Sequence, residues 1–159
     1  MLEQPFKQHL LLALGARSDM RVHSQNVGSV RIIRNNETIS RFHAGPPPGA
    51  SDISGIVLPG FRIEIETKGA KTKTGVAQHA WSAMITKFGG IYVRVRYDES
   101  QSMDENITRA VNEIESAISR RRAIHMNIIQ DKKTASRIAP HSPVTSLVPS
   151  ASKQKRTAR

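Results

Sequence analysis

The chain has 159 residues, enough for one domain with a single core, and its 24 Lys or Arg against 13 Asp or Glu give a net charge of +11. Aromatic residues make up 4% of it, so the core must be mostly aliphatic. The absence of cysteine excludes disulfides, thiolate metal sites and a cysteine nucleophile. The positive charge favours a polyanion partner, most simply nucleic acid, over a role in solubility alone.

The N-terminal stretch "MLEQPFKQHLLLALGAR" predicts a helix from about Glu3 to Leu14, because Pro5 suits a first turn and Gly15 suits a stop. Its apolar middle lacks a basic start, so we expect a soluble helix rather than a signal peptide. No apolar run approaches the roughly 18 residues needed to span a bilayer. We therefore expect a cytoplasmic protein with no membrane partner.

Extended chain and turns follow this helix. The sequence "MRVHSQNVGSVRIIRN", the turn "NNET" and the strand "TISRF" together predict a hairpin. The stretch "HAGPPPGAS" holds three prolines flanked by glycines, which predicts a rigid loop. "DISGIVLPG" then predicts a short strand ending in a Pro-Gly turn, and "FRIEIETKG" predicts a second strand closed by Gly69.

Two further helices are predicted, one on each side of the strand "IYVRVR". The first covers about 75–88, with Thr74 as its N-cap. Its apolar face holds Ala77, Trp81, Met84, Ile85 and Phe88. Ser102 and Glu105 form a capping-box pattern that opens the second, and "SRRRA" is its expected last turn. Its apolar stripe holds Ile107, Val111, Ile114 and Ile118.

Residues 1–130 are therefore predicted to form one α/β domain, with a mixed central sheet flanked by helices. The remaining residues, 131–159, hold seven Lys or Arg against one Asp and few apolar side chains. Such a segment cannot bury enough surface to fold, so we expect a disordered basic tail.

The strand "FRIEIETK" alternates strictly between apolar and charged residues. Because successive strand side chains alternate faces, Glu64, Glu66 and Lys68 point the same way. Asp52 begins the preceding strand, so it can lie beside Glu66 if the two strands pair antiparallel. The alternative is an edge strand with a solvated charged face.

Two carboxylates close together repel each other, and the pKa of each rises unless a cation lies between them. Mg²⁺ or Mn²⁺ suits that place, since both ions prefer carboxylate, water and phosphate oxygens. Such an ion can polarise a phosphoryl group and activate water. A neighbouring lysine can position or deprotonate the water, or stabilise the developing charge. These residue types therefore match phosphodiester hydrolysis.

The stretch from "GPPPGASD" to "IYVRVR" resembles the VRR-NUC nucleases, a branch of the PD-(D/E)xK superfamily, and especially their small stand-alone phage and bacterial forms. The resemblance covers about Glu3 to Arg96. Its motifs follow the family's order: a Glu near the start of the first helix at Glu3, Asn-x-Gly at Asn26-Val27-Gly28, a Gly-rich turn leading to Asp52, E-x-K at Glu66-Thr67-Lys68, a helix starting near Gln78, and Gly89-Gly90.

The resemblance implies a restriction-endonuclease-like PD-(D/E)xK core and a metal-dependent endodeoxyribonuclease with one or two Mg²⁺ or Mn²⁺ ions as cofactor. The implied metal ligands are Asp52, Glu66 and the Thr67 carbonyl, with Glu3 binding directly or through water. Lys68 is the implied catalytic lysine, and Gln78 would orient it or the attacking water.

The resemblance also implies partners and a setting. Stand-alone members of the family resemble junction-resolving enzymes and pair as homodimers, which implies a DNA substrate, branched DNA included, and a homodimer. The setting is a bacterial or phage-infected host cell. Lys71 and Lys73, in the loop "GAKTKTG", are expected to contact DNA phosphates near the site, with a merely solvated loop as the alternative.

The chain departs from the family at three places. Ser51 stands where the family often has Pro, and Ser24-Gln25 where it often has Arg. Glu64 usually has no acidic counterpart, so we expect it to lie behind the metal ligands or on the surface, with a metal ligand as the alternative.

Two rival functions stay open. One is a catalytically inactive nucleic-acid-binding module on the same fold, and the other is a structural or regulatory phage protein whose basic tail does the binding. The presence of Asp52, Glu66, Lys68 and Gln78 together favours the enzyme.

Overall fold

The structure is a computed structural model that describes residues 3–25, 28–34 and 37–138. The chain divides into two compact units, Met1–His125 and Met126–Arg159. The first unit contains the candidate site and all strands found in the described residues, and it is mixed α/β, as the sequence predicts.

Four strands of the first unit form one mixed sheet in the order β1-β4-β5-β6: β1 (Met20–Ser24), β4 (Ile53–Val57), β5 (Phe61–Gly69) and β6 (Ile91–Tyr97). β4 pairs antiparallel with both β1 and β5, whereas β5 and β6 are parallel. The charged strand β5 therefore has neighbours on both sides. This position excludes the alternative of a solvated edge strand.

The predicted hairpin is confirmed as a separate two-stranded sheet. β2 (Gly28–Arg34) pairs antiparallel with β3 (Glu37–Ala44), with a register irregularity between Ile32 and Ile33. The first two residues of the expected Asn-x-Gly element and the expected turn at 35–36 lie outside the described residues.

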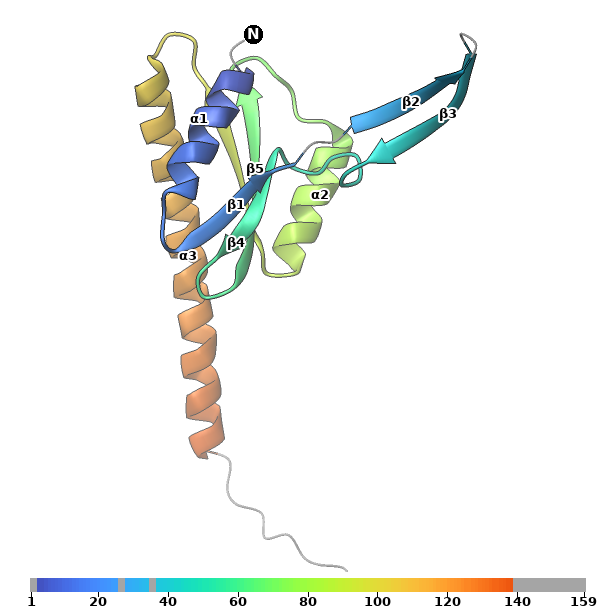
Figure 1. Ribbon diagram of the computed structural model, residues 1–159. Helices are drawn as coiled ribbons and strands as arrows, with labels where there is room; N and C mark the ends of the chain where they lie inside the picture. The colour runs from blue at the N-terminus through green and yellow to red at the C-terminus, as the bar shows by residue number, and fades with distance from the viewer. Residues whose placement is uncertain (1–2, 26–27, 35–36, 139–159) are drawn as a thin grey trace, which may run out of the picture. The chain divides into compact units, whose positions relative to one another are not determined.

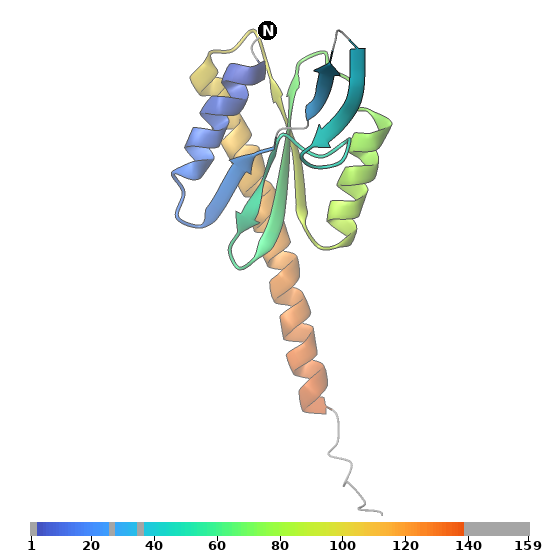
Figure 2. The ribbon, with the colours of Figure 1, turned by 45° about the vertical axis from the view of Figure 1, so that its right-hand side comes forward.

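The two faces of the four-stranded sheet are covered by different helices. Figures 1 and 2 show α1 (Glu3–Gly15) and the beginning of α3 (Met103–Ile138) on one side and α2 (Val76–Lys87) on the other. The core lies on the α1 and α3 side and buries Phe6, Leu10, Leu14, Ile63, Ile65, Val93, Val95, Ala110, Ile114 and Ile118. None of the described helices is long and apolar enough to cross a membrane.

The predicted apolar stripe of the last helix is thus confirmed, because Ile114 and Ile118 are buried and Ile107 and Val111 pack against the core. The capping box of α3 is confirmed too, because the Ser102 backbone N–H donates to Glu105 Oε2 at 2.8 Å and the Glu105 N–H donates to Ser102 Oγ at 3.3 Å.

The prediction for α2 is wrong in two respects. Its N-cap is Gly75 rather than Thr74. Of its expected apolar face only Ile85 is buried, while Phe88 is 80% exposed and Trp81 is half-buried. The reason is that α2 covers the charged face of β5, so polar contacts decide which of its side chains point inward.

The end of the last helix also differs from the prediction. No Gly or Pro follows Arg122 before Pro140, and α3 continues to Ile138. Residues 131–138 are therefore helical rather than a disordered tail, and residues 139–159 lie outside the described residues. Arg121 lies within α3 rather than at its end, and its Nε–H donates to the Gly89 carbonyl at 2.7 Å.

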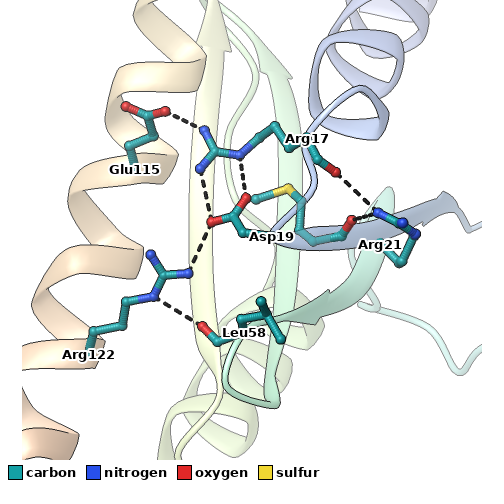
Figure 3. A network of polar contacts seen from close by, with 7 residues as sticks. Arg17, Asp19, Arg21, Leu58, Glu115 and Arg122 are labelled. Atoms are coloured by element: carbon teal, nitrogen blue, oxygen red, sulfur yellow. Dashed lines mark hydrogen bonds and ion pairs between the residues drawn. The ribbon is translucent and has the colours of Figure 1, made fainter.

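A polar network ties the link between α1 and β1 to α3 (Figure 3). Asp19 accepts a hydrogen bond from Arg17 Nε at 2.9 Å and another from Arg122 Nη2 at 3.0 Å, and Arg17 also contacts Glu115. The Arg17 guanidinium, aided by Arg122, lowers the pKa of Asp19 to about 2.

Asp19→Asn is expected to lower the free energy of unfolding by about 1–2 kcal/mol at pH 7, because the partly exposed carboxylate loses its ionic partners. Because the native pKa of Asp19 is lowered, its carboxylate stabilises the fold at pH values above the ordinary pKa of 3.8. This stabilisation is lost as the pH falls from 3.8 toward the native pKa of about 2. Urea unfolding of both proteins should show the difference shrinking across that window. A difference independent of pH would contradict the ionic role.

Candidate active site

β4 and β5 bring two carboxylates together. Ile53 pairs with Ile65, so the antiparallel register continued by one residue sets Asp52 opposite Glu66, as predicted. The loop before Asp52 packs tightly on α2. Gly49 has a φ of 91°, and a Cβ added there would lie 2.4 Å from the carbonyl oxygen of Ala77.

Asp52 is anchored to β5 through one carboxylate oxygen. Its Oδ2 accepts hydrogen bonds from the Thr67 backbone N–H at 2.9 Å and from the Thr67 hydroxyl at 2.7 Å. The N–H and C=O groups of one strand residue point to the same edge. The Thr67 carbonyl, an expected metal ligand, therefore points to the edge of β5 that faces Asp52.

Glu66 is buried, with 2% of its surface exposed, and its two oxygens have different surroundings. Oε1 accepts from Lys68 Nζ at 2.7 Å and from the Gln78 side-chain amide. Oε2 is buried and accepts no hydrogen bond from any residue that the structure describes. Burial raises the pKa of the Glu66 carboxyl, the hydrogen bond from Lys68 opposes that rise, and the Asp52 charge adds to it.

Gln78 is held at both ends of its side-chain amide. Its Oε1 accepts a hydrogen bond from the Gly75 backbone N–H at 3.1 Å, and its Nε2 donates to Glu66. The start of α2 thus positions Gln78 against the same carboxylate oxygen that Lys68 contacts. The structure brings Asp52, Glu66, Lys68 and Gln78 into one cluster, and the sequence had singled out all four.

The donor set suits a hard divalent cation. Two carboxylates and a backbone carbonyl are the oxygen ligands that Mg²⁺ and Mn²⁺ prefer. In the described part of the chain no group donates a hydrogen bond to the buried Oε2 of Glu66. Within the described ranges no three His, Cys, Asp or Glu residues form a metal-sized group, so the chain supplies few side-chain ligands there. Glu3 begins α1, but its side chain lies outside what the structure describes.

Glu64 differs from Glu66, although both are buried on the same face. Its Oε1 accepts from Ser54 Oγ at 2.8 Å and from Arg62 Nη2 at 2.7 Å, and Trp81 Nε1 lies 3.4 Å from Oε2. These partners occupy both oxygens. Glu64 therefore lies neither on the surface nor free to bind a metal, and it links β4, β5 and α2.

The basic loop after β5 is fixed by a residue that the sequence analysis missed. Arg96 Nη1 donates to the carbonyls of Gly69, Ala70 and Thr72 at 3.2–3.3 Å. Lys71 and Lys73 lie in this loop with exposed side chains. They are free to meet a ligand, but they make no hydrogen bond or ion pair with any residue that the structure describes.

Tyr92 and Arg94 of β6 were missed as well. In the parallel register Tyr92 pairs with Glu64 and Arg94 pairs with Glu66, so they share the charged face. The alternation of "IYVRVR" contained this signal, but only the strand order shows that β6 lies beside β5.

Comparisons of the chain with protein-family models, with curated proteins and with solved structures each found no match.

Proposed function

We propose that the chain is a metal-dependent endonuclease that hydrolyses DNA phosphodiester bonds on a restriction-endonuclease-like PD-(D/E)xK core of the VRR-NUC type. The observation that carries this proposal is the cluster of Asp52, Glu66, Lys68 and Gln78. Lys68 and Gln78 contact Oε1 of the buried Glu66, and no described residue makes a hydrogen bond to its Oε2. The net charge of +11 suits a polyanionic substrate.

Asp52, Glu66 and the Thr67 carbonyl would hold Mg²⁺ or Mn²⁺. The bound ion would polarise the phosphoryl group and neutralise charge that develops on it. The hydrogen bonds from Thr67 to Asp52 Oδ2 leave the other Asp52 oxygen available, and the burial of Glu66 excludes bulk water from its carboxylate.

Lys68 would stabilise negative charge on the phosphoryl oxygens, since its ammonium lies beside Glu66 Oε1 at the edge of the cluster. Gln78, fixed by the Gly75 backbone N–H, would hold the Glu66 carboxylate in position beside Lys68. In the reaction a water oxygen bonds to phosphorus while the bond to the 3′ oxygen breaks, and the water proton passes to the leaving oxygen through solvent.

The proposal extends to the partners. The exposed Lys71 and Lys73 would contact phosphates on either side of the cut. A homodimer in the cytoplasm would present two such sites, which suits a two-fold-symmetric branched substrate.

Cleavage is expected to require Mg²⁺ or Mn²⁺ and to stop in EDTA, because Asp52 and Glu66 are hard oxygen ligands. The test incubates the full chain with linear, nicked, flapped and four-way DNA, with and without each metal. Mn²⁺ at about 100 times its Kd should also add about 2.7 kcal/mol to the free energy of unfolding.

The matched control for this experiment is Glu66→Gln, whose unfolding should not respond to Mn²⁺. Full cleavage in EDTA would refute the metal site. Binding of DNA with no cleavage in any metal would favour the inactive binding module instead.

A further inference from the structure

Several buried polar atoms gather beside the candidate site without partners. Six buried side-chain atoms among the described residues lack a hydrogen bond, and four of them belong to Ser51, Glu66, Tyr92 and Arg94. Native structures satisfy the great majority of such atoms. A concentration of unsatisfied ones at one place therefore calls for an explanation.

The topology brings the four residues together. Arg94 pairs with Glu66 across β5 and β6, Tyr92 lies two residues before Arg94 on the same face, and Ser51 precedes Asp52. Burial and the Glu66 charge raise the pKa of the Tyr92 hydroxyl, whereas Arg94 and Ser51 lower it, so both lie near that hydroxyl. Neither these two residues nor any other that the structure describes makes a hydrogen bond of good geometry to it.

Three of the four unsatisfied groups can donate a hydrogen bond, namely Ser51 Oγ–H, Tyr92 O–H and Arg94 Nε–H, whereas the fourth, Glu66 Oε2, can only accept one. Leaving a buried donor without an acceptor is unfavourable, because the group has given up its hydrogen bonds to water. Arg94 forms no ion pair with any residue that the structure describes, although Glu66 is its register partner. The Arg94 Nε–H can only donate, so the partner that it lacks is an acceptor, and an anionic one suits the guanidinium best.

We propose that Ser51, Tyr92 and Arg94 form a subsite for one phosphate group of the nucleic-acid strand, next to the carboxylates of Asp52 and Glu66. This subsite rests on the proposed function for its ligand, and it adds recognition of the strand to the chemistry of Glu66 and Lys68. The guanidinium would bind two phosphate oxygens, and the two hydroxyls would set the orientation of the group.

The test follows the Arg94 Nε–H signal in a ¹⁵N NMR spectrum of the full chain in EDTA. The signal is assigned by its loss in Arg94→Lys, and inorganic phosphate is then added against sodium chloride of equal ionic strength. We expect a saturable shift with phosphate and none with chloride.

Tyr92→Phe removes only the hydroxyl, and it should weaken phosphate binding about tenfold, the effect of one hydrogen bond to a charged group. Ser51→Ala should also weaken phosphate binding. The control is Tyr97→Phe, since Tyr97 is the other tyrosine of the chain and lies in the core cluster on the opposite face. It should leave phosphate affinity unchanged.

Two results would overturn the subsite: an Arg94 signal that responds equally to chloride and phosphate, or equal phosphate affinity in Tyr92→Phe and Tyr97→Phe. Cleavage assays separate this outcome from failure of the proposed function. Saturable phosphate binding without metal-dependent cleavage would retain the subsite and reject the nuclease. Metal-dependent cleavage together with an Arg94 signal that does not respond to phosphate would retain the nuclease and reject the subsite.

Discussion

Glu66→Gln is expected to lower the rate of DNA cleavage by about three orders of magnitude or more, because it neutralises a carboxylate that acts as one unit with Asp52 and Lys68. The amide keeps the size of the side chain, and its oxygen can still accept from Lys68. The measurement is the single-turnover rate at saturating DNA and Mg²⁺, which separates chemistry from binding.

The matched control is Glu64→Gln. Glu64 is equally buried and lies two residues away on the same strand, but Ser54, Arg62 and Trp81 already engage its oxygens. This variant should unfold more easily and still cleave at a rate within about tenfold of the original. If Glu64→Gln loses cleavage while Glu66→Gln keeps it, the metal ligand has been assigned to the wrong glutamate.

Unfolding gives a second readout on Glu66. Its native pKa is raised by burial above the ordinary value of 4.5. The native state therefore holds the proton longer than the unfolded chain, and stability falls as the pH rises from 4.5 through the native pKa. Glu66→Gln has no carboxyl to titrate, so its free energy of unfolding does not fall in this way as the pH rises above 4.5. Urea unfolding without metal should therefore show the variant gaining stability relative to the original chain over that pH range.

The set of side chains on the charged face of β5 could be predicted from the sequence, because alternate residues of a strand point to the same face. Strict alternation placed Glu64, Glu66 and Lys68 together, and the short turn after β4 allowed Asp52 to reach Glu66. The same alternation could not tell the two glutamates apart. Their difference depends on Ser54 and Trp81, which come from elements whose packing no local pattern encodes.

Helix α2 shows why local patterns fail where a helix covers a polar surface. Its apolar residues recur at helical spacing, yet Phe88 stays exposed and Gln78 turns inward. On the inward face of α2, the hydrogen bond from Gln78 to the buried Glu66 carboxylate outweighs the burial of an apolar side chain, since a buried charge without a partner is costly. Similarly, the position of Tyr92 and Arg94 beside the two glutamates depends on the pairing of β6 with β5, which no local pattern encodes.

Lys68→Met is expected to reduce cleavage by about three orders of magnitude and to destabilise the fold by about 3 kcal/mol above the pKa of Glu66. Lys68 is 9% exposed, and its ammonium lies 2.7 Å from Glu66 Oε1. Removing it leaves a buried carboxylate for which, among the described residues, the Gln78 amide is the one remaining donor. Methionine keeps the length and packing of the side chain, so the charge is the main change.

The double variant Lys68→Met, Glu66→Gln distinguishes a lost charge pair from a lost packing contact. With both charges removed, the fold should regain at least 1 kcal/mol of the stability lost in Lys68→Met, because the uncompensated carboxylate is gone. Its cleavage should be no slower than that of either single variant, since residues that act as one unit are not additive. If the losses of stability and of cleavage rate in the double variant equal the sums of those in the two single variants, Lys68 and Glu66 act independently. The role proposed for Lys68 in the mechanism would then be wrong.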